Sequence, residues 1–309
     1  MGRAVINRLL ATGTRPLIAS VRANQTDLPA EVRTAFIGDL NSYTDWSSCL
    51  LDVEVVIHCA GRAHVAKKTT EFQLREYFQI NFEGTLALAR QAAKAGVQRF
   101  VYISTIKVNG ERTKVNAAFR ADDFPSPEDA YGMSKLEAER GLMALARETN
   151  MEVVIIRPPL IYGPGVKGNF YSMVQWVRKG LPLPLGAVHN KRSLIALENL
   201  VDFIVLCSES DRSPQAVNEV FLISDGEDIS TTELIRKVAL AYKVKPLLPP
   251  IPVNWIQIFA SLLGKEAMAD RLLSSLVVDA SKTIKLLGWR PIVSIEEQLK
   301  EMALHDSHS

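Results

Sequence analysis

Hydrophobic residues gather along the chain in short continuous runs, which alternate with stretches where apolar positions recur every three or four residues. A continuous run is typical of a parallel strand covered on both faces, and the second spacing predicts an amphipathic helix. The expected strands are Pro16–Val21, Val32–Ile37, Val53–His58, Arg99–Ile103 and Glu152–Arg157. The expected helices among them are Gly2–Ala11, Glu71–Ala95 and Asp129–Asn150.

The second half of the chain predicts shorter and more mixed elements. Pro158 and Pro159 end the last of those strands and predict a loop through Leu160–Gly165, because proline cannot continue a strand ladder. Asn190–Ile195 is an apolar strand led by two cations, and the tail from residue 251 to 302 is expected to form short helices.

Length and composition favour a globular chain of two lobes. With 309 residues and 47% hydrophobic content, the chain can bury a full core. The net charge is +2, from 36 basic and 34 acidic residues without a long run of one sign. This balance provides no basic footprint for nucleic acid or an anionic membrane, so neither is expected as a partner.

Cysteine usage indicates a reducing compartment, and the hydropathy of the chain indicates a soluble protein. Cys49, Cys59 and Cys207 are far apart and each lies in an apolar segment, which favours buried reduced thiols over a disulfide. His64 has no partnered cysteine or acid at ligand spacing, so no metal is expected. The chain has no run of 18 apolar residues and no signal-peptide pattern at its start. We therefore expect a soluble, cytoplasmic protein.

The clearest candidate chemistry is a tyrosine and a lysine, Tyr131 and Lys135, one helical turn apart. Residues at i and i+4 share a helix face, so the lysine ammonium could lower the pKa of the tyrosine phenol toward working pH. A tyrosine tuned in this way is a general base or acid for an alcohol. The alternative is two surface residues that meet by chance.

A hydroxyl pair, Ser104 and Thr105, ends the strand Arg99–Ile103 and precedes the Tyr131 helix. A strand end, a hydroxyl and a Tyr-Lys helix in that order resemble the short-chain dehydrogenase/reductase superfamily. The surrounding residues resemble its extended branch, the NAD-dependent epimerase/dehydratase family that modifies nucleotide sugars. Alignment on Asn109-Gly110 implies that Thr105 is the catalytic hydroxyl beside the substrate, with Ser104 as its nearest competitor.

The resemblance implies a doubly wound parallel sheet, Rossmann-like, with helices on both faces and a smaller C-terminal substrate lobe. Residues 1–160 would form the dinucleotide-binding domain. Residues 161–309 would form mainly the substrate lobe, with some segments returning to the sheet. The family begins with a strand and a glycine-rich turn, of which only Gly2 is matched here. The chain thus resembles a member that lacks the first strand, or one that never had it.

The resemblance also assigns a cofactor site. Arg22 stands where an acid would bind the ribose of NAD, which favours NADP, although a solvated loop arginine explains it equally well. Asp39 and Leu40 would cup the adenine, or else form a turn before a helix. Ala60 and Gly61 would let the cofactor approach the backbone. The implied set for NAD or NADP is Gly2, Arg22, Asp39, Leu40, Ala60, Gly61, Asn81, Tyr131 and Lys135, with Asn81 supporting the site from behind.

Two further residues are implied for the substrate. Arg192, helped by Lys191, would bind the diphosphate of the nucleotide sugar, because a guanidinium offers a bidentate fork. Asn169 would touch the diphosphate or the base, with a helix N-cap as the alternative. The partner implied by the resemblance is therefore a nucleotide sugar, with UDP as its expected nucleotide, and a homodimer is one expectation for the assembly.

The two residues after the catalytic hydroxyl narrow the reaction. The 4,6-dehydratases of the family carry an Asp-Glu pair there, whereas this chain has Ile106 and Lys107. Redox at a sugar carbinol remains: a UDP-hexose 4-epimerase is the first interpretation, and a nucleotide-4-keto-sugar reductase of surface-polysaccharide synthesis is the second. Two further hypotheses assign no catalytic function: the chain is a catalytically silent NADP-binding relative, or it is a truncated chain.

Overall fold

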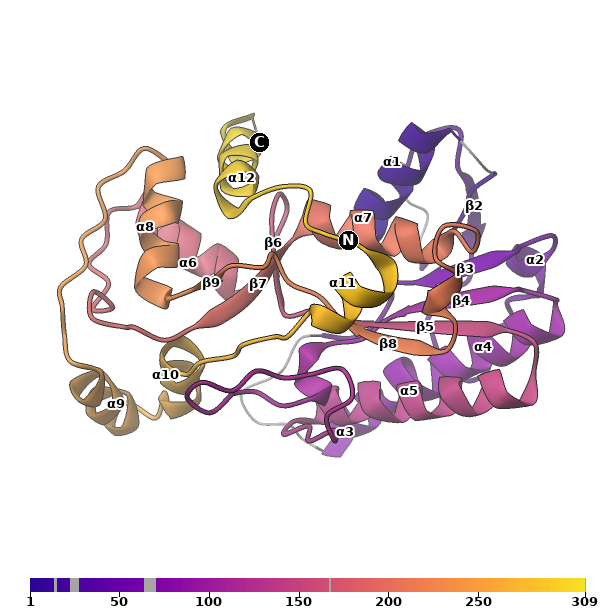
Figure 1. Cartoon of the computed structure of the whole chain (residues 1–309), viewed down its shortest axis with the longest axis horizontal. Helices are drawn as coiled ribbons and strands as arrows, with labels where there is room; N and C mark the ends of the chain where they lie inside the picture. Colours follow the sequence, from indigo (N-terminus) through magenta and orange to yellow (C-terminus); the bar gives the residue numbers. More distant parts are fainter. Residues whose placement is uncertain (14–15, 23–27, 64–70, 167, 309) are drawn as a thin grey trace.

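The computed structural model describes residues 1–13, 16–22, 28–63, 71–166 and 168–308. Its centre is a four-stranded parallel sheet in the order β3-β4-β5-β8. The strands are β3 (Val55–His58), β4 (Arg99–Ile103), β5 (Glu152–Arg157) and β8 (Glu219–Leu222). Three of them lie where continuous apolar runs predict strands. The prediction of a parallel α/β sheet with helices on both faces is confirmed (Figure 1).

The sheet separates two hydrophobic cores, because successive side chains of a strand point to opposite faces. On one face, Phe100 and Tyr102 of β4 pack with helices α4 (Thr85–Lys94) and α5 (Ala130–Glu148). On the other, Val101 and Ile103 pack with α1 (Gly2–Thr12) and α7 (Leu197–Ser208). Figure 1 shows α4 and α5 below the sheet and α1 and α7 above it.

Two strands stand beside this sheet as a separate parallel pair. Strand β1 (Ile18–Val21) pairs with β2 (Arg33–Phe36), residue for residue from Ile18–Arg33 to Val21–Phe36. Within the described residues, neither strand forms a ladder with β3. Both β1 and β3 are therefore edge strands on one side, at the position where the family resemblance implies a further strand.

A second unit lies at the C-terminal ends of the central strands. Its sheet contains β6 (Leu160–Tyr162), β7 (Arg192–Ala196) and β9 (Asp228–Ile229), with β6 parallel and β9 antiparallel to β7. The core around β7 is built from α6 (Asn169–Arg178), α8 (Thr231–Ala241) and α12 (Ile295–His308). The expectation of a loop after Pro159 is wrong, because Leu160–Tyr162 pairs with Leu194–Ala196.

The remaining helices are short and connect these units. They are α2 (Ser47–Leu50), α9 (Val253–Leu262), α10 (Glu266–Leu273), α11 (Ser281–Leu287) and the 3₁₀ turns Ile106–Val108 and Pro214–Ala216. In the described part of the chain, no helix combines the length and apolarity that crossing a bilayer requires. Segments beyond residue 160, namely α7, β8 and α11, return to the central sheet.

The helix expected over Glu71–Ala95 forms as one continuous helix with three segments. An α-helix, α3 (Glu71–Tyr77), continues as a π-helical segment, η1 (Phe78–Gly84), and then as α4. Extra residues within helical turns are rare and occur mostly at functional sites. The π-helical segment contains Asn81, whose side chain is fully buried.

Candidate active site

Tyr131 and Lys135 lie in the first two turns of α5. The side chain of Asp129 caps this helix by accepting a hydrogen bond from the Gly132 amide at 2.7 Å. The buried ammonium of Lys135 donates to the carbonyl oxygen of Ile103 at 2.8 Å. This bond fastens the start of α5 to the C-terminal end of β4, where the ligand site of an open α/β sheet is found.

The pKa of Tyr131 differs from the sequence-based expectation. Burial raises the pKa of its phenol to about 12, and a hydrogen bond with Thr105 opposes this only in part. The expected lowering by Lys135 is therefore wrong for this structure, since desolvation of the phenolate dominates. Burial likewise lowers the pKa of Lys135 to about 8, against the opposing charge of Glu139.

The two hydroxyls after β4 have separate partners. Thr105 has extended backbone, its side-chain oxygen accepts from the Lys107 amide at 3.3 Å, and its hydroxyl lies beside the Tyr131 phenol. The Ser104 hydroxyl donates instead to the carboxylate of Glu139. Neighbouring residues of an extended chain point to opposite sides, so Thr105 faces the tyrosine while Ser104 faces into the protein.

Asn81 joins the loop after β3 to the active-site helix. Its side-chain oxygen accepts from the Arg62 amide at 2.8 Å, and its NH₂ group donates to the Arg62 carbonyl at 3.1 Å and to the Ser134 hydroxyl at 3.0 Å. All of these partners belong to the protein. Asn81 thus holds the backbone after β3 against α5, and its support of a cofactor from behind stays a prediction.

The residues that follow β3 fit a dinucleotide. Ala60 and Gly61 are exposed at the C-terminal end of the strand. A Cβ at Gly61 would lie 3.0 Å from the Asn81 side-chain oxygen and 3.4 Å from the Lys135 ammonium. The missing Cβ thus lets Asn81 and Lys135 pack tightly against one side of the Gly61 backbone, and a flat ligand could approach this exposed residue beside the lysine.

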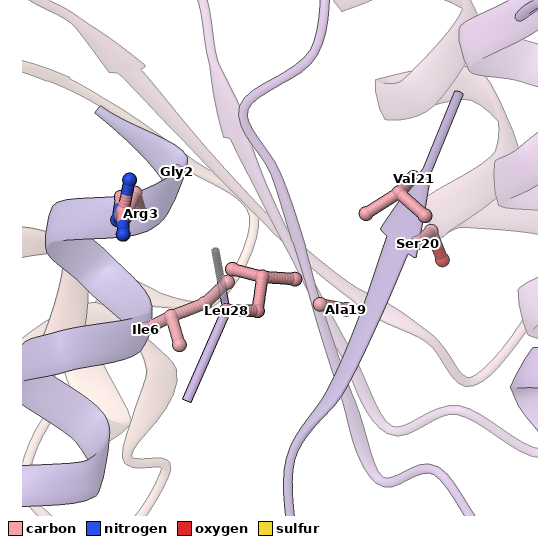
Figure 2. A pocket seen from close by; sticks show the side chains of 7 residues that line it. All are labelled: Gly2, Arg3, Ile6, Ala19, Ser20, Val21 and Leu28. Carbon is pink, nitrogen blue, oxygen red and sulfur yellow. The ribbon is translucent and has the colours of Figure 1, made fainter. Parts of the chain in front are cut away.

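A cavity of about 180 Å³ lies between the start of α1 and the end of β1 (Figure 2). Its lining residues are Gly2, Arg3, Ile6, Ala19, Ser20, Val21 and Leu28. No side chain caps the first turn of α1, and a Cβ on Gly2 would lie 4.0 Å from Cys59 after β3. The amides of this helix start therefore lie next to the β3 end and suit a phosphate.

Arg22 and Asp39, predicted separately for the adenosine end, lie together. Their ion pair joins Nε and Oδ1 at 3.3 Å, and both side chains are mostly exposed. Leu40 packs against the π-helical segment, because a Cβ at Gly84 would meet its Cγ at 2.9 Å. The structure thus brings three of the predicted cofactor residues to the edge formed by β1 and β2.

The substrate residues predicted in the second unit lie on β7 and α6. Arg192 is the first residue of β7, and its NH1 donates to the carbonyl oxygens of Arg271 at 2.7 Å and Ser274 at 3.1 Å. Burial lowers the pKa of its guanidinium. Lys191 is exposed. Asn169 is the first residue of α6, where Gly168 is the N-cap, which removes the capping alternative.

Two of the predictions fall on parts of the chain outside the described residues, namely the side chain of Asn169 and the whole of His64. The diphosphate contact of Asn169 and the expected absence of a metal at His64 therefore stay predictions.

Sequence reasoning missed a buried network behind the hydroxyls. Glu139 binds Arg157 through three hydrogen bonds, and Arg157 NH1 also donates to Asn109 at 3.0 Å. The signal was present in the spacing, since Glu139 follows Lys135 by one helical turn. The spacing of Lys135 and Glu139 is also that of an ordinary surface Lys-Glu pair. Only the burial of Glu139 distinguishes the network from such a pair.

Comparisons with known proteins point to one family. The profile of the NAD dependent epimerase/dehydratase family matches residues 1–222. The chain is 47% identical to a UDP-glucose 4-epimerase of Vibrio cholerae over 268 residues, which are 86% of this chain and 81% of the relative.

Solved structures share the fold. A UDP-glucuronic acid 4-epimerase from Bacillus cereus in complex with NAD gives a TM-score of 0.78 at 19% identity, over 99% of this chain and 95% of that chain. A UDP-glucose 4-epimerase from Thermotoga maritima with UDP-glucose gives 0.76 at 22% identity, over the same shares of 99% and 95%.

Proposed function

The chain belongs to the NAD-dependent epimerase/dehydratase family, and we propose that it interconverts UDP-hexoses that differ in configuration at C4. The observation that carries this proposal is the grouping of Tyr131, Thr105 and Lys135 at the C-terminal end of β4. The 47% identical relative, a UDP-glucose 4-epimerase, supports the choice of substrate.

In this proposal NAD lies along the C-terminal ends of β1, β2 and β3. The start of α1 at Gly2 would bind its phosphates, Asp39 and Leu40 would bind its adenine, and Ala60 and Gly61 would border it near Lys135. When bound, NAD supplies a hydride acceptor and donor for the sugar carbon. We assign this cofactor to residues 1–160 and the sugar to residues 161–309.

Tyr131 moves the proton of the 4-hydroxyl. With a pKa of about 12 it carries its own proton at neutral pH. The phenol can therefore donate that proton to the oxygen of a 4-keto sugar, and the resulting phenolate takes the proton back in the reverse direction. Thr105 holds the same oxygen by a hydrogen bond. Lys135 places its ammonium one helical turn from Tyr131, where it donates to the Ile103 carbonyl at the end of β4.

Arg192 and Asn169 are proposed to hold the diphosphate. Arg192 uses NH1 for two carbonyls of the protein, and a guanidinium has five N–H donors in all. The remaining donors would bind the substrate, which is the reason for choosing this arginine over the exposed Lys191.

The second candidate function is the reduction of a nucleotide-4-keto sugar. The observation that favours it is Arg22 at the end of β1, where an acid would select NAD. A reductase must exchange its cofactor at each turnover, and NADP(H) is the usual reducing pool. The silent-relative hypothesis is disfavoured because the Tyr131, Thr105 and Lys135 group is intact.

The deciding experiment monitors UDP-glucose by proton NMR with purified protein and NAD. The proposal expects UDP-galactose to form, with no net change in nicotinamide absorbance. The matched arm supplies NADPH and a UDP-4-keto-hexose. Stoichiometric NADPH oxidation there, without any epimer from UDP-glucose, would replace the epimerase by the reductase.

We propose a cytoplasmic location, which the separate reduced thiols of Cys49 and Cys207, both buried, support. A homodimer is also proposed, and sedimentation equilibrium of the purified chain tests it.

A further inference from the structure

Glu139 is a buried carboxylate one turn beyond Lys135 on α5. Its oxygens accept from Arg157 Nε at 3.0 and 3.2 Å and from Arg157 NH2 at 2.5 Å. The side chains of the pair are 5% and 4% exposed. Removing two charges from water costs more than most ion pairs return, so stability alone does not account for this pair.

The pair has two more partners, one on each side. The hydroxyl of Ser104 donates to Glu139. Arg157 NH1 donates to the side-chain oxygen of Asn109 at 3.0 Å, and Asn109 in turn donates to the Arg120 carbonyl at 2.9 Å. The network therefore joins α5, the end of β4, the end of β5 and the loop that follows Thr105.

The position of Ser104 in the chain makes this network relevant to the reacting groups. It lies between Ile103, whose carbonyl accepts from Lys135, and Thr105, whose hydroxyl lies beside Tyr131. An extended chain alternates its side chains. Holding Ser104 against Glu139 consequently turns Thr105 to the opposite side, toward the tyrosine.

We propose that Glu139 is a positioning residue: together with Arg157 it fixes Ser104, and so sets Thr105 and Lys135 in place around Tyr131. The proposal deepens the proposed epimerase function and rests on it. Its charge has a second effect, since the carboxylate raises the pKa of Lys135 against the lowering caused by burial. Glu139 thus helps to keep the lysine an ammonium.

The first test replaces the whole pair, because removing one partner would leave a buried charge and endanger folding. Glu139→Met with Arg157→Met keeps similar volume and is expected to fold. Its kcat should fall by about tenfold or more, with the KM for UDP-glucose changed less than about twofold. The titration midpoint of Lys135, followed by lysine ¹³Cε NMR and assigned with Lys135→Met, should fall by about one unit.

The matched control is Glu137→Gln, which removes an exposed carboxylate of the same helix that pairs with Arg140. It should leave kcat and the Lys135 midpoint unchanged. A folded double variant with wild-type kcat and wild-type Lys135 midpoint would overturn the proposal. The NMR titration does not need turnover, so a failure of the epimerase assignment is seen separately as absent activity in the wild type.

Ser104→Ala tests the positioning role of the Glu139 network if the double variant does not fold. It removes one hydroxyl and no charge. The proposal expects a lower kcat at unchanged KM, because Thr105 loses its orientation. A raised KM at unchanged kcat would instead make Ser104 a substrate-binding residue and would refute its role in the network.

Discussion

Arg22 and Asp39 form an ion pair, 3.3 Å from Nε to Oδ1, at the carboxyl ends of two paired strands. Each is predicted for the adenosine end of the cofactor by a different argument. The pair implies that the arginine charge is shared between Asp39 and any ligand bound there. Arg22 is therefore a weaker NADP determinant than its position alone indicates.

Arg22→Ala should lower the affinity for NADP severalfold and change that for NAD little. A guanidinium that faces the ribose edge can bind a 2′-phosphate, which NAD does not have. Fluorescence titration with both dinucleotides measures the ratio. Arg33→Ala, an exposed arginine at the opposite end of β2, is the control. Equal losses for NAD and NADP would show that Arg22 does not face the 2′ position.

Tyr131→Phe should reduce turnover by about two to four orders of magnitude and leave UDP-sugar binding nearly unchanged, because only the proton-transferring group is removed. Tyr43→Phe, at a tyrosine that is 91% exposed, is the control. Near-wild-type turnover of Tyr131→Phe would remove this residue from the chemistry.

The raised pKa of Tyr131 gives a separate optical prediction. With the pKa at about 12, the ligand-free protein should show no phenolate absorbance from Tyr131 between pH 7 and about 10. The difference in ultraviolet titration between wild type and Tyr131→Phe isolates this group. A difference signal with a midpoint near pH 7 would restore the idea that Lys135 lowers the pKa without a ligand.

Asn81→Ala should lower the free energy of unfolding by about 1–3 kcal/mol, because it leaves the Arg62 amide and carbonyl without their buried partner. NAD affinity should fall as well, since the backbone beside Gly61 loses its support. Urea unfolding and cofactor titration measure the two effects. Asn254→Ala, at an exposed residue of α9, should change neither quantity.

The sequence was sufficient where one local pattern determined the outcome. Strands such as Glu152–Arg157 have the predicted bounds, because a strand covered on both faces of a sheet needs a continuous run of apolar residues. The Tyr131–Lys135 spacing likewise placed both groups on one helix face. Roles assigned to these residues by resemblance remain predictions.

Features made by tertiary contacts were beyond sequence reasoning. The π-helical segment contains Asn81, whose side chain bonds to Arg62 and Ser134. Both partners are distant from Asn81 in the sequence. Strand β6 is only three residues long and follows two prolines. The direction of the Tyr131 pKa shift depends on burial, and the spacing of Tyr131 and Lys135 carries no information about burial.

The burial of Lys135 makes a contribution to stability that depends on pH. Its pKa is lowered from 10.5 to about 8, first because burial disfavours the ammonium. The unfolded chain therefore binds more protons than the folded protein between about pH 8 and 10.5. Stability contributed by this group must rise with pH across that window and stay constant below it. The shift corresponds to a change on the order of 3 kcal/mol.

Lys135→Met isolates this term, because all other titrating groups are common to both proteins. The free energy of unfolding of wild type, relative to Lys135→Met, should rise by on the order of 3 kcal/mol between pH 7 and 10.5. Urea unfolding at several pH values measures the difference. Lys94→Met, at an exposed lysine of α4, is the matched control. A flat difference for Lys135→Met would mean that its ammonium is not desolvated in the folded protein, and the site would then be more open to water than the 2.8 Å bond to Ile103 implies.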